Sequence, residues 1–273
     1  MDFTERVAIF VFFGFAVWAL SVKFRLKDYQ AQPLSWLDLG ITLIGLVMVS
    51  SYEEWVGPMA RHLVSMQDSW IYPLRDFFFY SNPWTQFACH VLFADFMAYW
   101  MHRFLHTRHV WPFHAFHHSA KSLNVLSGMR GSPVHYLLVN LPYTFSGLLM
   151  IYAGHPGVTL TLFLIDVLVQ HHTHSALRIP YTKYVEYLFI TPRLHFVHHH
   201  PNPVYTDSNY GFVFSWWDKI FGTFTDPDQV RLEEKGQLGL DYEMSHLKLF
   251  LGFKRPAIPS TVPPAKEREQ KSA

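Results

Sequence analysis

The sequence predicts an all-α integral membrane protein with about four transmembrane helices, two of them forming a hairpin, beneath a histidine-rich helical cap. Three observations lead to this prediction. First, 50 % of the 273 residues are hydrophobic and only 16 % are charged, whereas charged residues make up about a quarter of ordinary soluble domains. Second, long uncharged runs alternate with turn-forming residues. Third, 13 of the 18 histidines fall within residues 102–118 and 171–200.

The charge balance excludes one class of function. Lys and Arg number 22 and Asp and Glu number 21, so the formal charge is +1 and there is no basic surplus for binding nucleic acid. The one cysteine, Cys89, cannot form an internal disulfide, and its apolar surroundings favour a packing role. Histidine is therefore the residue type that sets this composition apart.

The first two membrane helices are predicted by uncharged runs. Residues 7–22 carry no charge and are followed at once by Lys23, as in a transmembrane helix whose terminal lysine reaches the interface. A cleavable signal peptide is the alternative, but Asp2 and Glu5 stand where such a peptide has basic residues. Residues 39–52 form a shorter run that predicts a second helix, either membrane-crossing or buried and re-entrant.

The later runs predict a third helix and a hairpin. Residues 84–101 are mainly apolar, with Asp95 as their one acidic residue. Residues 131–165 contain no Lys, Arg, Asp or Glu, and as one helix they would extend for about 52 Å, against a hydrocarbon core of about 30 Å. The run must fold back, and the Gly and Pro residues of 153–157 supply the turn. We therefore expect a hairpin over 134–170, with helices at 134–152 and 158–170.

Basic residues predict the topology. Lys23, Arg25 and Lys27 follow the first helix, and the excess of basic residues on the cytoplasmic side of membranes places this end inside. The following crossings bring both histidine clusters to the cytoplasmic face. The predicted divisions are N-terminal membrane helices in 1–94, a histidine-rich region in 95–224 that includes the hairpin, and a cytoplasmic segment in 225–273. The last of these ends in a Pro-rich, charged tail that we expect to be disordered.

The histidines recur at helical spacing. Residues three and four positions apart share a helix face, so His102 and His106 should project together, with Asp95 on the same stripe. Three further segments repeat this pattern: HAFHH (His114, His117, His118), HFVHH (His195, His198, His199) and HHTH (His171 and His174 on one face, His172 offset). Because imidazole is the commonest metal ligand near neutral pH, these segments on one side of the membrane predict a metal centre.

The number of ligands predicts the number of ions. A structural zinc takes about four protein ligands and a catalytic one about three. The segments HRFLH, HAFHH and HFVHH, which we call the histidine boxes, supply eight histidines, and His174 is a ninth. We therefore expect two ions, each with a position open for oxygen or water. Spacing alone leaves iron, zinc, copper and nickel as candidates. We interpret Asp95 as an acceptor for the N–H of a ligand imidazole, or else as a polar helix-packing residue.

Five stretches of the chain resemble the sterol desaturase and fatty acid hydroxylase family, whose members are integral-membrane, non-haem diiron enzymes. They occur in the family's order: DFMAYWMHRFLH (95–106), WPFHAFHHS (111–119), HSALRIP (174–180), TPRLHFVHH (191–199) and DSNYGFVFSWWDKIFGTF (207–224). The resemblance implies an O2-dependent, membrane-bound oxidoreductase that hydroxylates or desaturates a lipid C–H bond, of a sterol, a fatty acyl chain or a related lipid.

The resemblance also implies the cofactors and their ligands. It implies two iron ions and a catalytic region at 95–224. The implied iron ligands are His102, His106, His114, His117, His118, His174, His195, His198 and His199. His171 and His172 remain possible substitutes for His174. Because the sequence has neither a C-x-x-C-H haem motif nor cysteines for a cluster, we expect a separate electron donor of the cytochrome b5, ferredoxin or rubredoxin kind.

One departure from the family pattern and two rival functions remain open. Where the family carries R-x-H-P-x-E, this chain has Ser132 and His135 in place of the His and Glu, so whether His135 contributes to the site is undecided. Arg130 and Arg193 either hold a polar lipid head or pair with acidic residues. A membrane metal transporter would carry its ligands near the membrane midplane. A zinc-dependent membrane hydrolase would need a general base beside its histidines, as in HExxH, which is absent.

Overall fold

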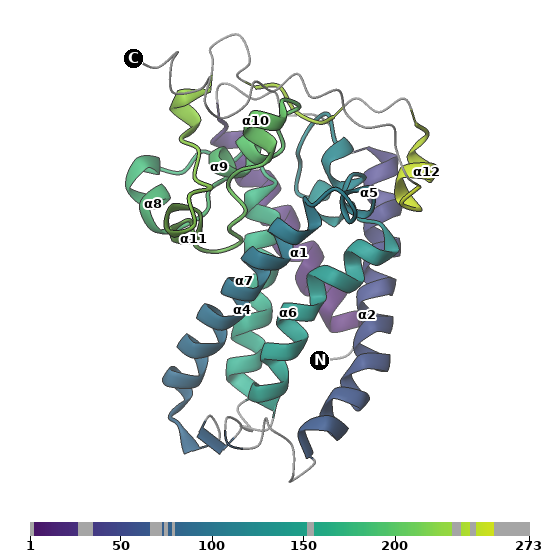
Figure 1. The fold of residues 1–273 in the computed structure, drawn as a ribbon, viewed down its shortest axis with the longest axis vertical. Coiled ribbons are helices and arrows are strands. Elements are labelled where there is room, and N and C mark those ends of the chain that lie inside the picture. Colours follow the sequence, from purple (N-terminus) through teal and green to yellow (C-terminus); the bar gives the residue numbers. More distant parts are fainter. Residues whose placement is uncertain are drawn as a thin grey trace.

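The computed structural model describes residues 3–26, 35–65, 73, 76–77, 80–151, 156–230, 236–240 and 244–253. Within these residues the chain is helical, and β-pairing is limited to the isolated bridges Arg25–Leu177 and Phe189–Phe214. The predicted all-α class is confirmed for this part of the chain. Long helices form a bundle, and short helices form a cap at one end of it (Figure 1).

The bundle consists of the long helices that the uncharged runs predict. They are α1 (Phe3–Lys23), α2 (Trp36–Ser65), α4 (Pro83–Leu105), α6 (Pro133–Ile151) and α7 (Pro156–Thr173). Helix α6 packs against α4 and α2, and α1 packs against α7. The two predicted hairpin helices correspond to α6 and α7. The turn predicted between them lies partly outside the described residues, since 152–155 are not described, and the predicted disordered tail also lies outside them.

Helix α2 differs from its prediction. The uncharged run 39–52 suggests a short segment, but the helix has 30 residues and continues past two acidic residues and through Pro58. The segments Thr4–Lys23 of α1 and Trp36–Val56 of α2 are both long and apolar enough to cross a membrane. Their large apolar side chains point outward: Phe12 is 67 % exposed and Leu43 is 57 % exposed. Exposed apolar side chains on helices of this length favour contact with lipid over contact with water.

The cap is built from short helices, and capping side chains stabilise the starts of some of them. The Thr191 side chain accepts a hydrogen bond at the start of α9, and the Asn202 side chain does so at the start of α10, each directly before a proline. The cap elements are α5 (Trp111–His114), η1 (His117–Ser119), η2 (Ser127–Met129), α8 (Thr182–Leu188), α9 (Pro192–His198), α10 (Pro203–Thr206), α11 (Trp216–Ile220), η3 (Pro227–Gln229) and α12 (His246–Phe250).

A buried ion pair joins the cap to the bundle. The Asp38 carboxylate near the start of α2 accepts from Arg130 Nε at 2.6 Å and from Asn124 Nδ2 at 3.1 Å. On the other face of the cap, Arg193 pairs with Glu186 at 2.9 Å. Of the two interpretations of Arg130 and Arg193, the structure favours pairing with acidic residues.

We predict that Asp38→Asn lowers the free energy of unfolding by about 3 kcal/mol, because it leaves the Arg130 charge buried without its counter-charge. Thermal unfolding in detergent measures this change. The matched control is Lys183→Gln, which breaks an ion pair with Asp228 in which the lysine side chain is 77 % exposed. Exposed pairs contribute about 0–1 kcal/mol, so the control should unfold close to the wild type. Similar midpoints for both variants would contradict the role of Asp38.

Candidate metal centre

Histidine side chains gather where the bundle meets the cap. They form two groups, and within each group the candidate ligand atoms all lie within 4.8 Å of one another. The five-histidine group comprises His102, His106, His114, His118 and His198. The four-histidine group comprises His117, His174, His195 and His199. Together they are the nine histidines that the sequence resemblance selects.

The spacing within each box decides which group a histidine joins. Histidines four residues apart stay together, as His114 and His118 do in one group and His195 and His199 in the other. The middle histidine of each box, His117 or His198, joins the opposite group. The prediction that all three histidines of a box act on one face is therefore wrong. Positions i+3 and i+4 differ by about 100° around a helix, which is enough to aim adjacent imidazoles at different centres.

The ring nitrogens converge at distances that suit shared coordination. In the four-histidine group, Nε2 of His195 lies 2.9 Å from Nε2 of His174 and 3.1 Å from Nε2 of His199. In the other group, the Nε2 atoms of His114 and His118 are 3.1 Å apart. Two nitrogens that each lie about 2.1 Å from one metal ion are about 3.0–3.4 Å apart at angles of about 90–109°. The donor set therefore fits one ion in each group.

Hydrogen bonds behind the rings fix which nitrogen faces inward. The Nδ1–H of His102 donates to the Tyr210 carbonyl at 2.9 Å, and that of His198 donates to the Ser208 carbonyl at 2.8 Å. His106 Nδ1 lies 3.1 Å from the Asp207 carboxylate. A proton on Nδ1 leaves the Nε2 lone pair free to bind a metal. The Nε2 atoms of His106 and His198 are buried without a hydrogen-bond partner, as expected of ligand atoms.

Burial keeps these imidazoles neutral. It lowers the pKa of His174 to about 4, because the charged form would lose its hydration. For six others, burial together with repulsion from neighbouring imidazoles holds the pKa well below the usual value: His114, His117, His118, His195, His198 and His199. All seven therefore present lone pairs at neutral pH, which is the state a metal ligand requires.

Asp95 does not accept from an imidazole, contrary to one of its two interpretations. Its carboxylate accepts from the backbone N–H groups of Val213 and Phe214, at 2.7 and 3.1 Å, and from Trp217 Nε1 at 2.9 Å. The physical reason is distance: seven residues separate Asp95 from His102, which is about 10 Å along α4. Asp95 instead anchors the loop 210–217, and the first residue of that loop accepts the hydrogen bond from His102.

Asp218 anchors the same loop from its other side. Its carboxylate accepts from the N–H groups of Tyr210 and Gly211, at 2.7 and 2.8 Å, and from Thr223 Oγ1 at 2.7 Å. Sequence analysis assigned no such role to Asp218. Hydrogen bonds from a side chain to the backbone of a nearby loop produce no regular spacing in the sequence from which they could be predicted. Two buried carboxylates thus hold the carbonyl that orients His102.

The three additional candidate histidines lie outside both groups. His135 is adjacent, with its Nδ1 2.9 Å from Nδ1 of His114 and its ring stacked on that ring. The ring nitrogens of His171 lie 2.9 and 3.0 Å from the carbonyl oxygens of Val125 and Phe10, so this residue joins α1 to α7. His172 is half-buried on another face of α7. Of the histidines in the HHTH segment, only His174 reaches a group.

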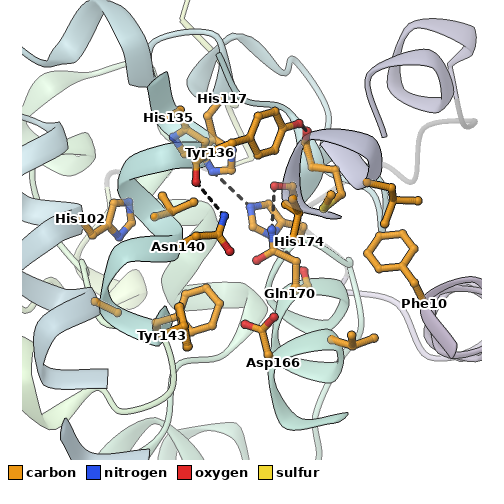
Figure 2. Close-up of a pocket in the computed structure, with 18 of the residues that line it drawn as sticks. Phe10, His102, His117, His135, Tyr136, Asn140, Tyr143, Asp166, Gln170 and His174 are labelled. Atoms are coloured by element: carbon orange, nitrogen blue, oxygen red, sulfur yellow. Dashed lines mark hydrogen bonds between the residues drawn. The ribbon is translucent and has the colours of Figure 1, made fainter. Parts of the chain in front are cut away.

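A cavity of about 190 Å³ extends from the histidines into the bundle. His102, His117 and His174 line one end, and Asp166 and Tyr143 lie farther away, as Figure 2 shows. Much of the remaining wall is apolar and comes from α1, α2, α6 and α7. Sequence reasoning missed Asp166. Its signal was a single acidic residue within a predicted membrane helix, a position that marks functional sites.

Comparisons with known proteins relate the chain to lipid-modifying enzymes. The sequence model of the fatty acid hydroxylase family matches residues 87–223, half of the chain. Alkylglycerol monooxygenase of Xenopus tropicalis is 31 % identical over 172 residues, which cover 63 % of this chain and 36 % of the relative. Lathosterol oxidase of Homo sapiens is 31 % identical over 160 residues, 58 % of this chain and 50 % of the relative.

A bacterial protein is similar over the same extent. Ornithine lipid hydroxylase OlsE of Rhizobium tropici is 28 % identical over 166 residues, 59 % of this chain and 49 % of the relative. The chain thus spans from about a third to half of the length of these relatives (36 % to 50 %). No solved structure matches the chain.

We predict that Asp95→Asn lowers the free energy of unfolding by about 2 kcal/mol, because the amide N–H2 would replace one carboxylate oxygen and face at least one of the three N–H donors. Hydrogen exchange should also become faster at the Val213 and Phe214 amides. Asp207→Asn is the control, since the Asp207 side chain is 61 % exposed and its change should remain below about 1 kcal/mol. Unchanged exchange in the Asp95 variant would count against the anchoring role.

Proposed function

The chain belongs to the fatty acid hydroxylase family, and on that premise we propose that it is a membrane-bound, O2-dependent diiron oxidoreductase that hydroxylates or desaturates a lipid C–H bond. The observation that carries the proposal is the division of nine imidazoles into a group of five and a group of four. Nine ligands exceed the four that a structural zinc ion takes and the three that a hydrolytic zinc ion takes. Two redox-active ions account for all nine.

We assign one iron ion to each group, with the nine histidines as ligands. A pair of bound iron ions supplies the activation of O2, which no protein side chain can provide for an unactivated C–H bond. With four or five histidine ligands, each ion would keep at least one position for oxygen or substrate if it takes six ligands in all. His135 lies behind His114 and, in this proposal, orients that ring.

The protein itself contributes orientation and exclusion of water. The carbonyl oxygens of Tyr210, Ser208 and Arg130 hold the imidazoles through their Nδ1–H groups. Fully buried apolar residues close the cap around the rings: Tyr99, Leu105, Phe116 and Leu194 each have 0 % exposure. A rigid, dry cage of this kind keeps ligand geometry fixed and limits side reactions with water.

We propose that α1, α2, α4, α6 and α7 cross the membrane and that the cap faces the cytoplasm. Support comes from Lys23 and Arg25 at the end of α1, where the Arg25–Leu177 bridge brings this end beside the cap. Basic residues at that end agree with a cytoplasmic location. A lipid could then enter the cavity from the bilayer without crossing water.

Substrate and partner follow from the same premise. The names of the relatives refer to an alkylglycerol, a sterol and an ornithine lipid, and we propose a lipid substrate for this chain too. The apolar wall of the cavity suits the hydrocarbon part of such a molecule. Because oxygen activation consumes electrons, a separate donor protein is part of the proposal.

Metal analysis of detergent-purified protein tests the proposal. We expect about two iron ions per chain, with a Mössbauer spectrum of a coupled pair, and lipid oxidation that requires both O2 and a reductant. A single zinc ion with activity in the absence of O2 would instead indicate a hydrolase. Metal uptake into proteoliposomes without lipid oxidation would indicate a transporter.

Substitution of one ligand tests the residue assignment. We expect His117→Ala to lose about half of the bound iron, because the four-histidine group would retain only three ligands, and to abolish turnover. Circular dichroism should show that the variant remains folded. His246→Ala is the control, since His246 is exposed on α12 and belongs to neither group. Equal loss of iron in both variants would refute the assignment.

A further inference from the structure

Polar side chains line the cavity at two matching depths below the histidines. On α7, Gln170 and Asp166 precede His174 by four and eight residues, so they lie about 6 and 12 Å from it along the helix. On α6, Asn140 and Tyr143 follow His135 by five and eight residues, so they lie about 8 and 12 Å from it along the helix. Both helices thus bring one polar side chain to each depth, as Figure 2 shows. We call Tyr143 and Asp166 the lower tier and Asn140 and Gln170 the upper tier.

The upper tier is partly satisfied within the protein. Asn140 Nδ2 donates to the Tyr136 carbonyl and Gln170 Nε2 to the Gly128 carbonyl, each at 2.7 Å. The amide N–H2 groups are therefore used to fix these side chains, and their oxygens remain as acceptors. The upper tier is thus rigid, and it offers acceptors beside the histidines.

The lower tier has no partner among the described residues. Tyr143 Oη is buried and forms no hydrogen bond, and no hydrogen bond or ion pair of the Asp166 carboxylate occurs in the described part of the chain. Arg6 also lines the cavity but is already engaged in an interaction. An unsatisfied hydroxyl and carboxylate are costly in an apolar bundle unless a ligand satisfies them.

We infer that the lower tier binds an alcohol hydroxyl of the lipid substrate, a specificity that rests on the proposed function. A hydroxyl can donate to the Asp166 carboxylate and accept from Tyr143 Oη through one oxygen atom. An ammonium group could donate to both residues but would leave the Tyr143 hydrogen without an acceptor, and a phosphate or carboxylate would be repelled by Asp166. The hydroxyl is thereby held about 12 Å from the histidines, which selects the carbon that lies at the metal centre.

Binding of matched probes tests this site without turnover. Detergent-purified holoprotein is titrated with hexadecanol and with its methyl ether, which lacks the donor hydrogen. We expect the alcohol to bind about tenfold more tightly, since hydrogen bonds to charged groups are strong. Tyr143→Phe should weaken the binding of both probes, because either oxygen can accept from this hydroxyl, whereas Asp166→Leu should remove most of the preference for the alcohol. Leu168→Ala, on the outer face of α7, should retain it.

The outcomes are distinguishable from one another. Equal binding of the two probes by the wild type, or unchanged binding of both probes by Tyr143→Phe, would overturn the inference even if Asp166→Leu fails to fold. Tighter binding of hexadecylamine than of hexadecanol would assign the site to an ammonium group instead and would also overturn it. Iron-dependent oxidation without a preference for the alcohol would support the proposed function and overturn the inference. A preference for the alcohol without any oxidation would support the hydroxyl site and count against the proposed function.

Discussion

The structure depends on the enforced proximity of neutral imidazoles. Nine of them meet in two groups with Nε2 atoms as close as 2.9 Å, an arrangement in which lone pairs face one another. Without a cation such contacts oppose folding, so the surrounding structure must impose them. It does so through Nδ1–H bonds to backbone carbonyls, through the carboxylates of Asp95 and Asp218, and through a cap of fully buried apolar side chains. The cap, the loop that contains Tyr210 and the helical bundle therefore act together to fix the positions of the nine imidazole rings.

The spacing of the histidines predicted which of them gather at the candidate metal centre, but not how they divide into a group of five and a group of four. Hydrophobic runs predicted the positions of α1, α4, α6 and α7, the boxes predicted eight of the histidines, and the family resemblance selected His174 as the ninth. The assignment of His117 and His198 to the opposite group could not be predicted, because it depends on where α5 ends and η1 begins and on the rotation of α9. Angular position on an ideal helix is a local property, whereas the location of each centre is set by packing between distant elements.

Long-range partners were the other part that sequence patterns could not supply. Asp95 was placed correctly on the stripe of His102, yet it bonds to residues 118 or more positions away. Asp38 lies 92 residues from Arg130. The length of α2 was also missed, because glutamates and Pro58 interrupt its apolar pattern while the backbone remains helical. Local composition thus determined the helices, and tertiary contacts determined what their polar residues bind.

The cavity shows why a lipid enzyme of this design would need a polar anchor. An apolar wall can bind a hydrocarbon chain at several offsets, since the hydrophobic effect is non-directional and each buried methylene group contributes only about 0.8 kcal/mol. A metal centre at one end of such a wall would therefore meet several carbons in turn. The lower tier would select one of these positions. If the lipid slides along the cavity by one carbon, Asp166 and Tyr143 lose their hydrogen-bond partner in apolar surroundings. The distance between tier and histidines would then set the position of oxidation, and helix geometry fixes that distance.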